Sequence, residues 1–123
     1  MSVIFDIHGM QWPRDVDGCS LPPARMFVNP SNVNAVDFLR WIGLWNADLC
    51  GEIPAPKLAA ILRRRLWPSR RKAGDYGRKA QVTMEPGRVK VIDCGREPGR
   101  LAEYAVRLLA LAEFAGNRKI FWG

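Results

Sequence analysis

Histidine, cysteine and long apolar runs are all scarce in this chain of 123 residues. Its single histidine, His8, has no partner that the sequence defines, and we expect it to be an ordinary surface or edge residue. The cysteines, Cys19, Cys50 and Cys94, match no paired zinc-ligand spacing and leave one thiol over in any disulfide scheme. No apolar run approaches the roughly 20 residues of a membrane-spanning helix. We therefore expect reduced cysteines, no metal, no cofactor and no membrane segment.

The sequence also lacks the common catalytic signatures, among them the GxSxG elbow, the phosphate-binding lysine loop and the HExxH helix. The first residues carry no positive leader followed by an apolar core, so we expect no secretory signal and a cytoplasmic location. A hydrophobic content of 48%, with five Trp and five Phe, predicts a folded chain. The length suits a single domain over residues 1–123. We expect this domain to have no enzymatic activity.

Local patterns predict three helices and four to five short strands. Apolar periodicity and end signals place the helices near residues 34–42, 54–67 and 98–115. Asn34 is the expected N-cap of the first helix. Alternation and turn residues place the strands near residues 3–8, 25–28, 81–84, 88–92 and 119–122, with a type II turn at Pro86 and Gly87. Because helices and strands do not alternate, we predict an α+β fold, with the helices packed on a small mixed or antiparallel sheet.

Positive charge is what the chain has in excess, and it lies in one stretch. Residues 57–79 hold nine basic side chains and one acid, Asp75, whereas the rest of the chain holds ten basic and eleven acidic ones. The pattern predicts a helix end followed by a loop, residues 68–80, that presents cations together. The helix dipole alone favours part of this arrangement. Such a basic helix-loop segment attracts polyanions through its field.

We expect nucleic acid to be the partner of this segment, with the cations contacting phosphates and the aromatic rings stacking on unpaired bases. The predicted contact residues are Arg63, Arg64, Arg70, Arg71, Lys72, Tyr76, Arg78 and Lys79, with Trp67 as a second aromatic candidate. An acidic protein surface is the alternative partner, with exposed tryptophans as anchors ringed by charge. A solvated loop without a partner is the third interpretation. Small, Arg-rich single domains are common among phage and mobile-element accessory proteins, which is an association by composition only.

A second motif follows the predicted hairpin. Residues 94–100 read Cys-Gly-Arg-Glu-Pro-Gly-Arg between a predicted strand and a predicted helix, and this spacing resembles the phosphate-binding loop of cysteine-dependent phosphatases. The resemblance implies that Cys94 is a nucleophile and that Arg100 clamps the phosphoryl oxygens. Three residues depart from that pattern, namely Glu97, Pro98 and Leu101. The alternative is a simple turn into a helix, with Cys94 as a small buried apolar group.

Overall fold

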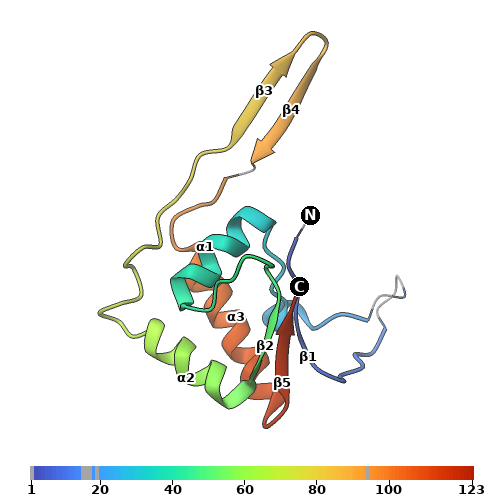
Figure 1. Ribbon diagram of the computed structural model, residues 1–123, viewed down its shortest axis with the longest axis vertical. Coiled ribbons are helices and arrows are strands. Elements are labelled where there is room, and N and C mark those ends of the chain that lie inside the picture. Colours follow the sequence, from blue (N-terminus) through green and yellow to red (C-terminus); the bar gives the residue numbers. More distant parts are fainter. Residues whose placement is uncertain (1, 15–17, 19, 94) are drawn as a thin grey trace.

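The computed structural model describes residues 2–14, 18, 20–93 and 95–123, with the backbone alone for residues 89–92. Within these residues the elements follow in the order β1 (Phe5–Ile7), η1 (Ala24–Met26, a 3-10 helix), α1 (Asn32–Ile42), β2 (Gly51–Pro54), α2 (Ala55–Arg65), β3 (Gln81–Glu85), β4 (Arg88–Asp93), α3 (Arg100–Ala115) and β5 (Lys119–Trp122). The predicted α+β class is confirmed (Figure 1). None of the described helices is long and apolar enough to cross a membrane.

The main sheet has three antiparallel strands among the described residues, in the order β1-β5-β2. Ile120 of the central strand pairs with Ile7 on one side and with Ile53 on the other. Strands β3 and β4 pair with each other and do not join this sheet. The prediction of one sheet with four to five strands is therefore wrong in its strand count, because the β3–β4 hairpin projects away from the body (Figure 1).

The strand predicted at residues 25–28 is also absent from the described elements, which have the short helix η1 and an extended segment there instead. The Val28 carbonyl accepts from the Phe5 amide at 3.2 Å, and the Pro30 carbonyl accepts from the Val3 amide at 3.0 Å. The segment thus lies along β1 as an irregular edge. Pro30 has no amide hydrogen to return the bond, which prevents a regular ladder.

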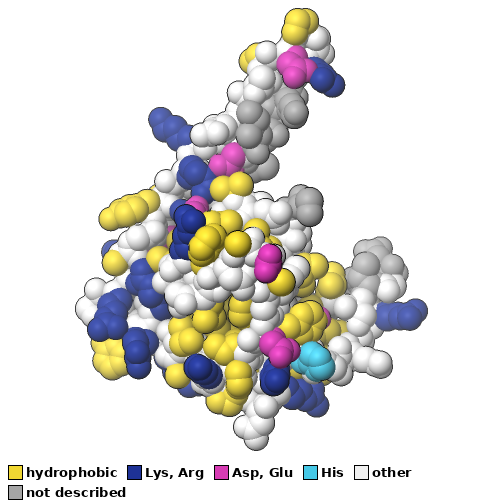
Figure 2. Space-filling view, viewed as in Figure 1, with side chains coloured by type: hydrophobic (Ala, Val, Ile, Leu, Met, Phe, Trp, Pro, Cys, Tyr) yellow, Lys and Arg dark blue, Asp and Glu magenta, His cyan; other side chains and the backbone are white. Residues whose placement is uncertain are grey.

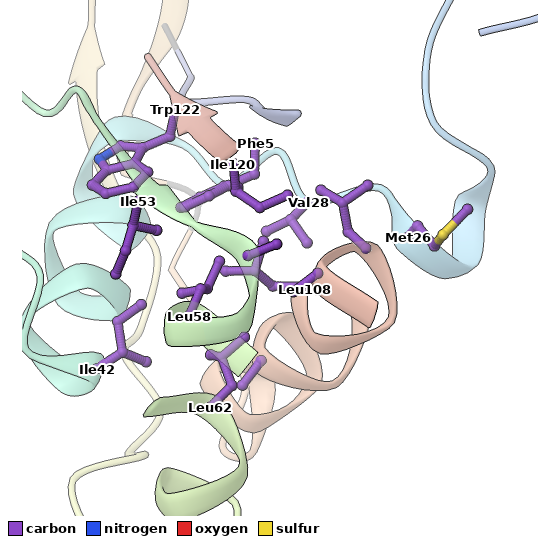
Figure 3. Packing of buried hydrophobic residues seen from close by; sticks show 14 of the residues in the cluster. Phe5, Met26, Val28, Ile42, Ile53, Leu58, Leu62, Leu108, Ile120 and Trp122 are labelled. Atoms are coloured by element: carbon purple, nitrogen blue, oxygen red, sulfur yellow. The ribbon is translucent and has the colours of Figure 1, made fainter. Parts of the chain in front are cut away.

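The hydrophobic core lies between the main sheet and the helices (Figure 3). Leu58 and Leu62 of α2 and Leu108 of α3 face Phe5 and Ile120 of the sheet, and none of the five is more than 1% exposed. Full burial of each such side chain stabilises the fold by about 1.5 to 3 kcal/mol. These leucines belong to the apolar periodicity that placed α2 and α3 in the sequence.

Helix α1 begins earlier than predicted, because Ser31 and not Asn34 is its N-cap. The Ser31 hydroxyl accepts from the Asn34 amide at 3.4 Å. Asn34 therefore lies inside the first turn, where its side chain is free to contact another part of the chain. It is 8% exposed, and its Nδ2 lies 3.5 Å from the Gly95 carbonyl oxygen. The helix ends at Gly43, in the left-handed conformation, as the sequence predicted.

The β3–β4 hairpin turns at Pro86 and Gly87, as predicted. Gly87 has a φ of 79°, which is the conformation that the second central position of a type II turn requires. Val82 and Met84 are 53% and 73% exposed, and no described hairpin side chain belongs to the core cluster. The hairpin is therefore an arm that is held at its base and not along its length.

Candidate nucleic-acid interface

The basic stretch covers α2 and the connection from α2 to β3, residues 66–80, which we call the basic loop. The loop opens with a tight turn in which the Trp67 carbonyl accepts from the amides of Arg70 and Arg71 at 2.8 and 2.9 Å. This turn presents Arg70, Arg71 and Lys72 in succession, all of them exposed. Figure 2 shows Lys and Arg side chains gathered over the end of α2 and this loop, at the lower left of the view.

Arg65 and Trp41 hold the first half of the basic loop. The Arg65 guanidinium lies over the Trp41 indole, 3.9 Å from the ring centroid, and its Nε donates to the Trp41 carbonyl at 3.0 Å. Its two terminal nitrogens donate to the carbonyls of Arg70 and Ala73, and Trp41 Nε1 donates to the same Ala73 carbonyl at 2.7 Å. Burial lowers the pKa of Arg65, and the nearby Asp75 opposes that shift. The guanidinium of Arg65 is thus used to hold the loop and is not part of the candidate interface.

Asp75, the one acid of the basic stretch, is buried and caps α3. Its two carboxylate oxygens accept from the amides of Leu101 and Ala102, each at 3.0 Å, and the residue is 6% exposed. A carboxylate at a helix N-terminus satisfies amides that have no partner within the helix and interacts well with the helix dipole. The carboxylate of Asp75 is therefore used inside the protein, and it makes no ion pair with a described cation of the loop.

Arg78 and Arg96 hold the second half of the loop at the base of the hairpin. Their backbones exchange two hydrogen bonds, of 2.7 and 2.8 Å. Arg78 donates from Nε to Asp93 at 2.5 Å, and from its terminal nitrogens to Asp37 and Asn34, each at 2.6 Å. Arg96 Nη1 donates to the same Asp37 oxygen at 2.6 Å. The guanidinium of Arg78 is therefore occupied by the protein, so we leave Arg78 out of the candidate interface.

The Arg78–Asp93 pair predicts a local acid transition at the base of the hairpin. The hydrogen bond from Arg78, with one from the Gly95 amide at 2.9 Å, holds the pKa of Asp93 below its ordinary value. The contribution of this carboxylate to stability is thus complete above about pH 4 and is lost as the pH falls through the lowered pKa. The hydrogen bond to Asp93, with the nearby Asp37, raises the pKa of Arg78, so its own contribution is lost only in strong alkali.

The Gly95 amide resonance, followed by NMR from pH 6 to pH 2, is expected to titrate with a midpoint below the ordinary aspartate value of about 3.9. Asp93→Asn should abolish that transition, because no carboxylate then accepts from the amide. A midpoint at or above the ordinary value would contradict the pairing.

Seven of the eight predicted contact residues are exposed, and Arg78 is the exception. Arg63 lies 3.1 Å from Glu113, in an exposed pair worth about 0 to 1 kcal/mol. The remaining five cations make no ion pair with a described residue, and they are Arg64, Arg70, Arg71, Lys72 and Lys79.

Two hollows accompany the exposed aromatic rings of the basic loop. One, of about 270 Å³, is lined by Arg64, Trp67, Ser69 and Arg70. The other, of about 360 Å³, contains Tyr76 and is lined further by Asp37, Arg40, Trp41, Gly74, Arg96 and Leu101. The sequence did not single out Ser69 or Arg40. Arg40 carries no local signal for this role, because it lies on α1 and reaches the loop only in the folded chain.

The phosphatase-like motif receives little support from the described geometry. Cys94, the predicted nucleophile, lies outside the described residues. Arg100, the predicted clamp, is the first residue of α3, and its guanidinium lies 3.5 Å from Glu103 and 3.9 Å from Glu97. The next two amides of α3, which would face a phosphate, already donate to Asp75. A hollow of about 400 Å³ lies beside the motif and contains Arg78, Arg96 and Arg100, of which the first two are bound to Asp37.

Neither a metal centre nor a known relative adds to this description. In the part of the chain that the structure describes, no group of three His, Cys, Asp or Glu side chains could hold a metal ion. Compared with models of protein families, with curated proteins and with solved structures, the chain matches none of them.

Proposed function

We propose that this protein binds nucleic acid and that it does so without catalysis. The binding surface, which we call the basic surface, consists of the exposed side chains of Arg64, Trp67, Arg70, Arg71, Lys72, Tyr76 and Lys79. The observation that carries the proposal is that the five cations of this surface make no ion pair with a described residue, while the loop that bears most of them is held at both ends.

Rigidity of the basic loop favours binding. Binding to a flexible segment has two unfavourable terms, one for ordering its backbone and one of about 0.5 to 1.5 kcal/mol for each long side chain that becomes immobile. A backbone that is already ordered avoids the first of these terms. Here Arg65, Trp41 and Asp75 fix the backbone before any ligand arrives. Three of the five cations are arginines, whose planar guanidinium groups can hold two phosphate oxygens at once.

Charge distribution also favours a polyanion. The net charge of +7 arises within residues 57–79, since the remainder of the chain is close to neutral. A localised positive field accelerates and orients the approach of a charged polymer, and it weakens as salt is added. An acidic protein would respond to the same field. Two exposed aromatic rings among the cations favour nucleic acid over that alternative, because nucleic acid offers base faces as well as phosphates.

A charge-reversal variant tests the proposal. Changing Arg70, Arg71 and Lys72 to Glu is expected to lower the affinity for labelled oligonucleotides on the order of 100-fold or more, because three phosphate contacts become repulsive. The slope of log K against log salt should become shallower by about 2 with a single strand and about 3 with a duplex, since each lost phosphate contact removes about 0.7 or 0.9 of a released counterion, respectively. Fluorescence anisotropy at several salt concentrations measures both quantities.

The matched control is the variant with Arg14, Arg25 and Arg118 changed to Glu, which alters the net charge equally at exposed positions outside the basic loop. We expect it to keep most of the affinity. Equal losses in the two variants would mean that the whole protein's charge attracts the oligonucleotide. No binding of DNA or RNA by the parent protein at low salt would overturn the proposal and leave an acidic protein as the partner to seek.

A further inference from the structure

The geometry around Trp67 points to single-stranded nucleic acid as the ligand. We propose that the indole of Trp67 stacks on an unpaired base while Arg64 and Arg70 hold the neighbouring phosphates. This inference rests on the proposed function and deepens it, because it assigns the type of strand and the residue that selects it. It depends on three properties of Trp67: its free ring faces, its rigid placement and its cationic surroundings.

Trp67 differs from the other tryptophans in how far its ring is exposed. Each of the other four rings is covered by another side chain. Two stack on aromatic rings, namely Trp12 on Phe114 and Trp122 on Phe5. Two lie under a guanidinium group, namely Trp41 under Arg65 and Trp45 under Arg40. Trp67 has no such partner among the described residues, and it is 64% exposed. Exposure of so large an apolar ring is unfavourable in water unless a ligand covers it.

The backbone at Trp67 is held in place although its side chain is exposed. The Trp67 amide donates to the Arg64 carbonyl at 3.3 Å, and the Trp67 carbonyl accepts from the amides of Arg70 and Arg71. Pro68, the next residue, restricts the chain further. The indole is therefore presented from a fixed turn, and stacking does not require the loop to be ordered first.

The residues around Trp67 suit the rest of a nucleotide. Arg64, Ser69 and Arg70 line the hollow of about 270 Å³ beside the indole. Neither arginine makes an ion pair with a described residue, so both can bind phosphates on the two sides of a stacked base. The Ser69 hydroxyl can donate or accept a hydrogen bond at the base or the sugar.

An aromatic ring of this kind distinguishes single strands from duplexes. Inside a duplex both faces of each base are already stacked on neighbouring bases, so the indole would gain contact only after an unfavourable unstacking of the duplex. An unpaired base has a free face, and stacking on an aromatic side chain then contributes without regard to sequence. Phosphate contacts from the arginines serve both kinds of strand.

The test compares Trp67 variants on three probes: oligo-dT and oligo-U of twelve nucleotides, and a DNA hairpin duplex with a similar number of phosphates. Trp67→Ala is expected to weaken binding of at least one single strand by about 5- to 150-fold, which corresponds to the range measured for base stacking, and to change duplex binding by less than about twofold. Trp67→Phe should retain most of the single-strand affinity, because it keeps an aromatic face. Trp45→Ala is the control, since Trp45 is partly exposed but covered by Arg40.

Each outcome separates this inference from the proposed function. If Trp67→Ala weakens the single strands and the duplex equally, or weakens neither, the stacking role is wrong, whereas nucleic-acid binding stands as long as the triple charge reversal abolishes it. If the parent protein binds none of the three probes, both proposals fall. Quenching of tryptophan fluorescence by oligo-dT that is undiminished in Trp67→Phe would also contradict the role of Trp67. Thermal unfolding of each variant shows whether the fold is unchanged.

Discussion

Replacing Asp75 with Ala is expected to lower the free energy of unfolding by about 3 kcal/mol. The substitution removes the acceptor of two amides at the buried start of α3, and each buried donor left without a partner destabilises a protein by about 1 to 3 kcal/mol. Loss of an N-cap alone is worth up to about 2 kcal/mol. Urea denaturation followed by circular dichroism measures the change in free energy. In thermal unfolding the same change should lower the midpoint temperature by about 10 °C.

Two further variants show whether the cap is the cause. Asp75→Asn keeps one carbonyl oxygen and should be destabilised by about half as much, since one amide retains its acceptor. Glu97→Ala removes a carboxylate from the same end of α3, but that side chain is 86% exposed and lies 3.9 Å from its partner, so we expect little change. A stability of Asp75→Ala equal to that of the parent would refute the capping role.

Asp37→Ala is expected to destabilise the protein by about 2 kcal/mol and to loosen the base of the hairpin. One oxygen of Asp37 accepts from both Arg78 and Arg96, and the Arg96 side chain is only 6% exposed. Removal of one partner from a buried ion pair is unfavourable by roughly 3 to 5 kcal/mol, and the partial exposure of Asp37 reduces this figure.

Hydrogen exchange locates the effect of Asp37→Ala. The amides of Arg78 and Arg96, which bond to each other's carbonyls, should exchange faster in the variant. Asp48→Ala is the control, because Asp48 is exposed and makes no ion pair with a described residue. Unchanged exchange at both amides would mean that Asp37 does not hold the hairpin.

Patterns within one element were sufficient to predict most of the local structure. Apolar periodicity identified the positions of α2 and α3, and the Pro86–Gly87 pair identified the hairpin turn. The N-cap of α1 was missed because Ser31, Asn32 and Asn34 are all suitable capping residues and the sequence does not rank them. The strand count was wrong because alternation predicts that a strand forms, but not which strand it pairs with.

The candidate site was predictable as a concentration of charge, but not as a geometry. Arg65 and Arg78 resemble the other cations of the stretch in sequence. In the fold, Arg65 binds Trp41, 24 positions away, and Arg78 binds Asp37 and Asn34, 41 and 44 positions away, all three on α1. The same holds for Asp75, which looked like a minor exception to the charge pattern and is the cap of a helix 26 positions later. Composition shows that cations are present, whereas only the fold shows which of them are already in use.

The β3–β4 arm has a consequence for the protein in concentrated solution. Among the described residues no third strand pairs with it, so its outer backbone groups are available to another chain, and the exposed Val82 and Met84 add apolar contact. Proline at the tip and the opposite charges of Glu85 and Arg88, 2.6 Å apart, discourage continuous edge-to-edge growth there. We therefore expect aggregation to involve the exposed edge of the arm near Val82 and Met84, and Met84→Lys to reduce it.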